Sequence, residues 1–380
     1  MPKVVIIKCD SYDHSRVLDS LKRGIDLLGG ISALFSPGEK ILIKPNILAG
    51  DHPDKNVTTH PAVLAGLADI FQGNDYLLSY GDSPGFGSLK RAAERAGIKR
   101  VFDDRGIEAG DFETIVNVSF QEGVILKNIP LAKGVTSSDA IISVSKMKAH
   151  GFTRITGAVK NQFGCLPGLI KGEFHVKMPD IIDFSKVLHD INNLVKPRLF
   201  IMDGIIAMEG NGPRGGNNIK MNTLLFSTDP IALDMVFCKL VDLNPEFVPT
   251  MRSCTNEDLM VYTHDDIELA GDKIDDLINS KFNVTRKKFE RFASAGSFPT
   301  FLKNLISPKP VIDYNTCKNC GKCVLQCPTD PKSLNWVDAG DFPYPVYDYK
   351  SCIRCYCCQE MCPHNSISIK TPLLGKLIRR

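Results

Sequence analysis

Several common signatures are missing from this chain of 380 residues. No stretch approaches the roughly 18 apolar residues of a membrane-spanning helix, and the apolar run near the amino terminus is too short for the core of a signal peptide. The formal net charge is only +3, which gives no support to a nucleic-acid partner, because proteins that bind DNA or RNA usually carry a stronger basic patch. We therefore expect a cytoplasmic protein without a transmembrane segment.

Familiar nucleotide-binding and catalytic motifs are also absent. The chain has no P-loop, no Gly-x-Ser-x-Gly motif and no Cys-x3-Cys-x2-Cys run of the kind found in radical enzymes that use S-adenosylmethionine. Gly210-x-Gly212-x-x-Gly215 has the spacing of a dinucleotide fingerprint, but Pro213 interrupts it and no helical pattern follows. The sequence gives no positive sign of a nucleotide and leaves bound flavin as an open alternative.

Cysteine, by contrast, is plentiful, with 13 residues, most of them in two runs near the carboxyl terminus. Both runs have the spacing Cys-x2-Cys-x2-Cys-x3-Cys-Pro. In two-cluster bacterial ferredoxins, three thiolates of such a run hold one [4Fe-4S] cluster and the fourth reaches the other cluster. The pattern predicts two [4Fe-4S] clusters, one held by Cys317, Cys320, Cys323 and Cys362, and the other by Cys352, Cys355, Cys358 and Cys327.

A zinc site or a disulfide framework is the alternative to iron-sulfur clusters. A zinc ribbon uses two Cys-x2-Cys pairs, whereas each run here repeats the pair at once, adds a fourth cysteine and follows it with proline. An odd total of cysteines also fits a reducing compartment, where thiols serve as ligands. Cys357 adds a further thiol to the second run; because Cys358 keeps the repeat intact, we interpret Cys357 as a spare thiol.

The rest of the sequence predicts a large α/β domain over residues 1–275. Short β-branched runs alternate there with amphipathic patterns, which is typical of a mostly parallel sheet with flanking helices. Strands are expected at 3–9, 40–44, 76–80, 139–145, 198–202 and 222–227. Helices are expected at 15–28, 60–71, 88–96, 180–195 and 230–241, and a glycine-rich loop at 205–216.

Three smaller segments follow the large domain. Residues 276–308 form a basic amphipathic connector, 309–371 a small α+β two-cluster ferredoxin-like domain, and 372–380 a loose basic tail. The connector would either contact a membrane surface or a partner, or pack the small domain onto the large one. Gly296 and Pro299 interrupt its helical pattern, which favours packing.

Polar side chains gather where the predicted strands end, which is where ligands bind in open α/β sheets. The candidate substrate-binding residues are Lys44, Asn46, Asp82, Lys146, Lys148, Lys160 and Asn161. If the fourth strand continues, Lys146, Lys148 and His150 share one face. Because such cations repel one another, the set predicts a small anionic substrate bearing a carboxylate, phosphate or similar group. His150 and His175 are the candidate catalytic proton donors.

Structural roles remain open for all of these residues. Lysines form a solvated basic face in many proteins, and either histidine would serve equally as a buried hydrogen-bonding group. Asp82 would be only a turn former, and Asp229 is first of all the expected N-cap of the helix that carries Asp234.

The large domain resembles a known family through a set of short motifs. They are Lys44-Pro45-Asn46, Gly81-Asp82-Ser83-Pro84, Lys146-x-Lys148-x-His150, Lys160-Asn161-x-x-Gly164, Asp203-Gly204, Gly210-x-Gly212-Pro213 with Gly216, and Asp229-Pro230-x-Ala232-x-Asp234. Over roughly residues 35–240 the chain is similar to domain of unknown function 362, and residues 309–371 resemble a bacterial-type ferredoxin. The resemblance implies an iron-sulfur protein with a carboxyl-terminal ferredoxin domain and leaves the substrate open.

Three functions compete on this evidence. The first is an oxidoreductase that passes electrons from two [4Fe-4S] clusters to an anionic substrate in the α/β domain, with a redox partner protein as donor. The second is an electron carrier whose α/β domain only docks a partner enzyme. The third is a redox or iron sensor, which ranks last because nothing in the sequence resembles a nucleic-acid reader.

Overall fold

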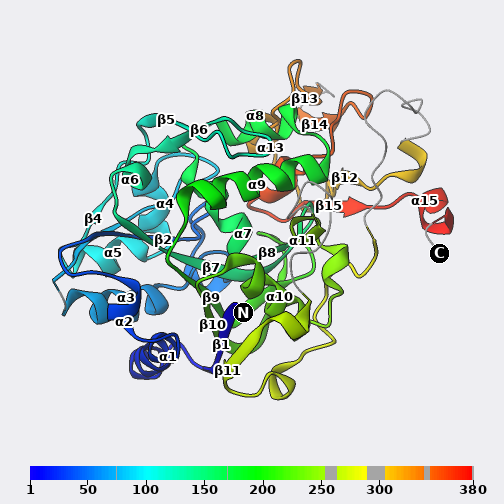
Figure 1. The fold of residues 1–380 in the computed structure, drawn as a ribbon. Coiled ribbons are helices and arrows are strands. Elements are labelled where there is room, and N and C mark those ends of the chain that lie inside the picture. Colours follow the sequence, from blue (N-terminus) through cyan, green and yellow to red (C-terminus); the bar gives the residue numbers. More distant parts are fainter. Residues whose placement is uncertain (74, 169, 253–262, 289–303, 338–342, 379–380) are drawn as a thin grey trace.

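The structure is a computed structural model, and it describes residues 1–73, 75–168, 170–252, 263–288, 304–337 and 343–378. A large α/β domain is followed by a small cysteine-rich domain (Figure 1). The predicted fold class is confirmed. Much of the predicted connector lies outside the described residues, and within the described part of the chain no helix is long and apolar enough to cross a membrane.

The large sheet has the strand order β11-β1-β10-β9-β7-β2-β3-β4, with β8 paired to β7. Strands β9, β7, β2, β3 and β4 run parallel to one another, whereas β10 is antiparallel to both β9 and β1. The bounds are β1 (Lys3–Lys8), β2 (Lys40–Pro45), β3 (Leu77–Tyr80), β4 (Glu108–Ala109), β7 (Ala140–His150), β8 (Arg154–Thr156), β9 (Leu199–Glu209), β10 (Asn217–Ser227) and β11 (Glu268–Gly271). The sheet is therefore mixed but mostly parallel.

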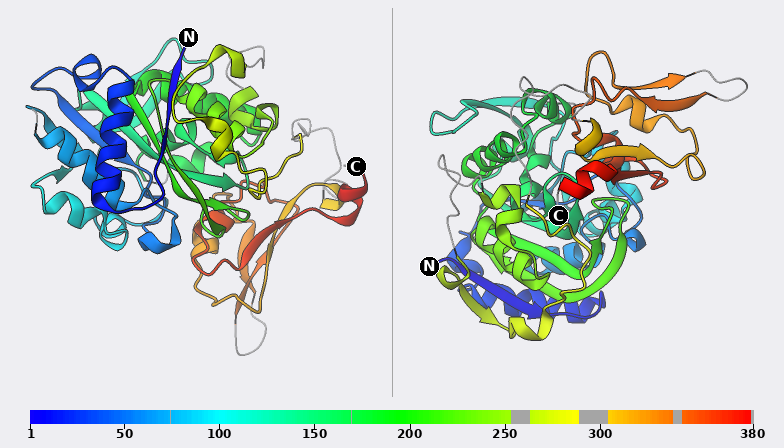
Figure 2. Two further views of the ribbon diagram at one scale, coloured as in Figure 1. Left: turned by 90° about the horizontal axis from the view of Figure 1, so that it is seen from below. Right: turned by 90° about the vertical axis from the view of Figure 1, so that its right-hand side faces the viewer.

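Helices cover both faces of this sheet (Figure 2). The longer ones are α1 (His14–Leu27), α3 (Pro61–Gln72), α4 (Leu89–Arg95), α5 (Ile98–Asp103), α8 (Ile170–Lys177), α9 (Ile181–Val195) and α10 (Pro230–Leu240). Short helices are α2 (Ile31–Leu34), α6 (Lys133–Thr136), α7 (Ala158–Asn161) and α11 (Pro249–Arg252). In α1 the buried Val17, Leu21 and Ile25 recur every four residues, so one apolar stripe faces the core.

Three local predictions needed correction. Strand β7 continues to His150 instead of ending at Ser145. The predicted glycine-rich loop is shorter than expected, because residues 205–209 belong to β9, which pairs with β10 as a long hairpin with Asn217 opposite Glu209. A separate hairpin of β5 (Ile115–Ser119) and β6 (Asn128–Ala132) carries no strong sequence signal and was not expected.

In its described residues, the small domain contains two antiparallel strand pairs and two short helices. They are β12 (Lys309–Ile312) with β15 (Ile367–Lys370), β13 (Leu334–Val337) with β14 (Tyr344–Tyr347), α13 (Lys322–Leu325) and α14 (Cys357–Met361). The expected loose tail instead begins with helix α15 (Leu373–Ile378).

The small domain docks at the end of the sheet where the parallel strands terminate (Figure 2). Arg214, in the β9–β10 turn, donates to both oxygens of Asp51 at 2.7 and 3.0 Å and to the carbonyl of Met361 at 2.8 Å. Gln359 Nε2 donates to the carbonyl oxygens of Asn211 at 2.9 Å and Gly212 at 3.1 Å. Well-formed hydrogen bonds thus hold α14 against the large domain.

Candidate functional site

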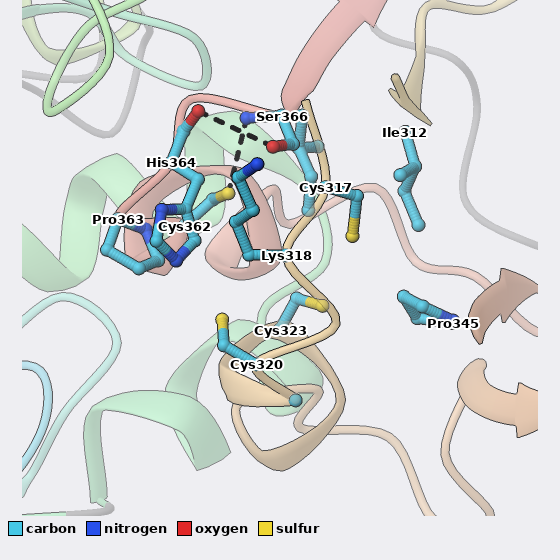
Figure 3. Close-up of a pocket in the computed structure, with 12 residues that line it drawn as sticks. Ile312, Cys317, Lys318, Cys320, Cys323, Pro345, Cys362, Pro363, His364 and Ser366 are labelled. Carbon is cyan, nitrogen blue, oxygen red and sulfur yellow. Dashed lines mark hydrogen bonds between the residues drawn. The ribbon is translucent and has the colours of Figure 1, made fainter. Parts of the chain in front are cut away.

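Four cysteines surround a hollow in the small domain. Cys317, Cys320, Cys323 and Cys362 line this space, which is partly open to solvent. Figure 3 shows their four sulfur atoms around that space. These are the thiols that the spacing assigns to one cluster, brought together from both cysteine runs.

The chemistry of these thiols fits an iron-sulfur cluster. Burial, followed by the charges of the neighbouring thiols, raises the pKa of Cys323 to about 11. Thiolates packed this closely repel each other unless bound cations compensate their charge, as iron does. The amide of Ser366 also donates to Cys362 Sγ at 3.3 Å, a type of contact that stabilises thiolate ligands (Figure 3).

The second set of thiols also lies together in the small domain. Cys352 is an electrostatic neighbour of Cys355 and Cys327, and Cys358 interacts with both Cys355 and Cys352. The hydroxyl of Tyr347 donates to Cys358 Sγ at 3.1 Å. Cys355 and Cys358 are buried, as are Cys323 and Cys362 of the first set.

At the end of β2, Lys44 and Asp82 form a buried ion pair with Nζ and Oδ1 2.7 Å apart. Asp82 Oδ2 also accepts from the amide of Ile47 at 2.8 Å. A Cβ atom at Gly164 would lie 1.9 Å from Asp82 Oδ1, so glycine is required for this close approach. Asn161 lies beside the pair and donates to Ser143 Oγ at 2.9 Å. These residues pair with one another inside the protein.

Lys146 is likewise paired inside the protein. Its Nζ donates to Asp203 Oδ2 at 2.8 Å and to the hydroxyl of Tyr12 at 2.7 Å. Asp203 accepts further bonds from the Tyr12 hydroxyl at 2.9 Å and the His60 amide at 3.0 Å, and the Tyr12 and His60 rings stack 3.6 Å apart. The repulsion expected at Lys146 is therefore relieved by Asp203 rather than by a bound anion.

Lys148 has only neutral contacts in the described part of the chain. Its fully buried ammonium donates to Asn46 Oδ1 at 2.6 Å and to the Val57 carbonyl at 2.7 Å. Burial, with repulsion from Lys146 and Lys160, lowers the pKa of Lys148 to about 7. Near neutral pH, a negative charge beside Lys148 would favour its protonated form.

His150 lies at the contact between the two domains. Its Nδ1 accepts from the amides of Phe152 at 3.0 Å and Thr153 at 3.3 Å, which places the proton of the neutral ring on Nε2. Nε2 lies 3.1 Å from Oε1 of Glu360, on α14 between two cluster ligands. Burial lowers the pKa of His150 to about 4. Burial alone would raise the pKa of Glu360, but His150, Lys160 and His175 outweigh it and lower that pKa to about 2.

Lys160 and His175 lie in an aromatic setting beside this pair. Lys160 Nζ is 5.3 Å from the centre of the Phe163 ring and 5.8 Å from that of Phe184, and His175 stacks on Phe184 at 4.5 Å. No hydrogen bond or ion pair of Lys160 Nζ occurs among the residues described. Burial lowers the pKa of His175 to about 3, and its Nδ1 is buried without a hydrogen-bond partner in the same residues.

The structure thus separates the predicted site residues into two groups. Lys44, Asp82, Asn161 and Lys146 make polar contacts within the large domain. Lys148, His150, Lys160 and His175 interact electrostatically around the contact with α14, and Lys148 also donates to Asn46. Sequence reasoning did not single out Glu360, Tyr12 or His60. An acidic residue inside a cysteine run, at position 360, was the one available signal for Glu360.

Comparison with known families agrees with the architecture. The model of a domain of unknown function, DUF362, matches residues 41–239, and that of a 4Fe-4S binding domain matches residues 310–332. The chain belongs to the DUF362 family. Its carboxyl-terminal domain is an iron-sulfur domain, which supports a role in electron transfer.

One curated protein and two solved structures are similar to this chain. This DUF362 protein is 33% identical over 251 residues to the thylakoid-associated protein sll1697 of Synechocystis, a match that covers 66% of this chain and 78% of the relative. Among solved structures, the lactate racemase apoprotein of Thermoanaerobacterium thermosaccharolyticum gives a TM-score of 0.42 at 11% identity, covering 63% of this chain and 56% of that one. A protein from Thermotoga maritima gives 0.36 at 12% identity, covering 59% and 57%.

Proposed function

We propose that this DUF362 protein is an oxidoreductase in which two [4Fe-4S] clusters supply electrons to a small anionic substrate bound at the end of the large sheet. The observation that carries the proposal is the contact between the two domains. Helix α14 contributes both the thiol of Cys358 and the carboxylate of Glu360, which lies 3.1 Å from His150 Nε2. The cluster-binding segment and the cationic residues therefore adjoin each other.

In this proposal the clusters supply single electrons, and the surrounding residues bind the substrate and deliver protons. Lys148 and Lys160 attract the anion. His150, with its proton on Nε2, is the proton donor nearest to α14, and His175 is the second donor. Phe163 and Phe184 reduce access of water to Lys160 and so strengthen its attraction for an anion.

The route of the electrons follows from what lies beside each thiol set. Cys320 is exposed, and the nearby Leu325 and Trp336 are 59% and 41% exposed. We assign this face to docking of a redox partner protein. Cys358 lies on α14, which also carries Glu360 beside His150 of the large domain. Electrons would enter at the cluster of Cys320 and leave from the cluster of Cys358.

Reoxidation of the reduced clusters tests the proposal. The protein is reduced anaerobically, small carboxylates and other oxoanions are added in turn, and the return of cluster absorbance is followed. For an anion that accepts electrons, His150→Ala should slow reoxidation about 100-fold or more at unchanged iron content, because a positioned proton donor contributes at least that much. Lys90→Met, at an exposed lysine of α4, is the control and should leave the reoxidation rate unchanged.

The alternative is an electron carrier whose large domain only docks an enzyme. It would be favoured if no anion reoxidised the clusters, or if His150→Ala and Lys160→Met left the rate unchanged while transfer to a protein acceptor persisted. Bound flavin is tested by its absorbance after the protein is denatured.

We also propose a cytoplasmic location. The name of the Synechocystis relative raises attachment to a membrane surface as the alternative, and α15 presents the exposed Leu373, Leu374 and Leu377 beside Lys376. Cell fractionation distinguishes the two, because attachment through α15 would place the protein with membranes and Leu374→Glu would release it.

A further inference from the structure

Glu360 differs from the other buried carboxylates of this protein. Asp190 accepts backbone amides from Val124, Ile125 and Leu126 at 2.7–2.8 Å. Asp234 accepts from two backbone amides, and Asp82 and Asp203 accept from lysines and amides. Buried carboxylates normally acquire such partners because an unsatisfied charge inside a protein is costly.

Glu360 Oε1, in contrast, has no hydrogen-bond donor in the described ranges of the chain. His150 Nε2 is 3.1 Å away, yet its N–H does not point at the carboxylate well enough to form a hydrogen bond, and Nε2 is itself unpartnered in these residues. The nearby His175 Nδ1 is buried and unpartnered as well. Two polar atoms therefore face each other without completing their hydrogen bonds, and a third unpartnered ring nitrogen belongs to a histidine that interacts electrostatically with both groups.

Docking of the small domain does not depend on Glu360. Arg214 and Gln359 make well-directed hydrogen bonds across the same contact, and Asn365 Nδ2 donates to the Gly215 carbonyl at 2.9 Å. Ile369 also packs close to Gly151, where a Cβ would lie 2.3 Å from Ile369 Cδ1. These other contacts hold the small domain in place, so docking does not explain why the Glu360 carboxylate is buried beside His150.

We propose that Glu360 occupies the anion subsite of the large domain, and that the subsite takes the carboxylate of a substrate in its place. This inference rests on the proposed function and names the substrate class. A carboxylate free to rotate would align with His150 Nε2 and approach Lys160 more closely than a side chain tethered to α14. Glu360 and the substrate compete for the same donors, so the substrate must displace Glu360 to bind.

Binding of acetate to Glu360→Ala tests this competition without any electron transfer. Removing the side chain leaves a cavity the size of a small carboxylate, and acetate that binds the folded state raises the melting temperature. At acetate ten times above its dissociation constant, the expected rise is about 2 °C relative to chloride of equal ionic strength. The wild-type protein and Glu360→Gln, in which acetate must first displace the side chain at position 360, should show a smaller rise.

A second substitution locates the effect. His150→Ala added to Glu360→Ala should abolish the acetate response, because the donor at 3.1 Å is gone. Equal responses of Glu360→Ala to acetate and chloride would overturn the inference, as would an acetate response in the wild type as large as in the variant. Glu360→Ser covers the case in which Glu360→Ala does not fold. It also removes the carboxylate, and acetate should stabilise it more than the wild type; an identical response overturns the inference.

The result is independent of the redox test. Failure of acetate to bind, with cluster reoxidation by another anion intact, removes the carboxylate subsite and leaves the oxidoreductase proposal standing. Acetate binding without reoxidation by any anion supports the subsite and removes the oxidoreductase proposal.

Discussion

Replacement of His175 by phenylalanine should make the protein more stable and less active. The ring stacks on Phe184 and lies edge-on to Phe152 and Phe163, an environment that accepts a phenylalanine of similar shape. Its Nδ1 is buried without a hydrogen-bond partner in the described residues. The imidazole of His175 therefore reduces stability although packing does not require it, and such a cost is typical of residues kept for function.

The size of the effect follows from the burial of that nitrogen. An unsatisfied buried polar atom costs about 1–3 kcal/mol, so His175→Phe should raise the free energy of unfolding by about that amount, which for a chain of this length is roughly 1–2 °C in melting temperature per kcal/mol. The gain should depend on pH. The pKa of His175 is about 3 in the folded state and 6.5 for the unperturbed group, so the unfolded chain binds more protons between these values. Wild-type stability therefore falls below pH 6.5, by up to about 1.4 kcal/mol per pH unit, and the variant lacks this loss.

Denaturant unfolding at pH 7.5 and pH 5.5 measures both quantities, and iron content verifies that the clusters are retained. His52→Phe, at an exposed histidine, is the control and should change stability by less than about 0.5 kcal/mol. A variant that is less stable than the wild type at both pH values would refute the reasoning, since it would mean that the imidazole makes a stabilising polar contact. A stabilised variant with full cluster reoxidation would show that His175 is not a proton donor.

Three further predictions concern packing and the clusters. Gly164→Ala should destabilise the protein strongly in denaturant unfolding, because the new Cβ would lie 1.9 Å from a carboxylate oxygen, whereas Gly73→Ala, with no atom within 4 Å, should have little effect. Cys357→Ser should retain the iron and acid-labile sulfide of the wild type and Cys358→Ser should lose part of both, since we assign only Cys358 as a ligand. Tyr347→Phe removes a hydrogen bond to Cys358 Sγ and should lower the reduction potential of that cluster in a potentiometric titration.

The sequence was sufficient to predict those parts of the structure that depend on a local pattern of residues. The β-branched runs of β1 and β2 and the four-residue spacing of α1 specify their elements directly. Cysteine spacing likewise predicts a ligand set, and the thiols of Cys317 and Cys362 do line one hollow. The end of β7 was placed too early because lysines at 146 and 148 look like solvent-exposed residues, and their burial depends on partners elsewhere in the chain.

Those partners could not be predicted, because they come from long-range contacts. Lys146 is neutralised by Asp203, 57 residues away, and contacts Tyr12, 134 residues away. Glu360 reaches His150 only through docking of the small domain. A pattern of strands fixes which side chains face one another along a strand, but no local pattern specifies how a second domain packs on the end of the sheet.

The position of Glu360 also bears on why an iron-sulfur domain is joined to this α/β domain. Helix α14 is only five residues long and is followed at once by Cys362, so the carboxylate near His150 and the thiol of Cys358 belong to one short rigid segment. A molecule that displaced Glu360 would therefore change the surroundings of a cluster ligand without any long-range conformational change. Conversely, an altered cluster would shift the carboxylate that competes for the site. The physical link between anion binding and electron transfer would then be this single helical turn, and separating the two domains would abolish it even if each part folded.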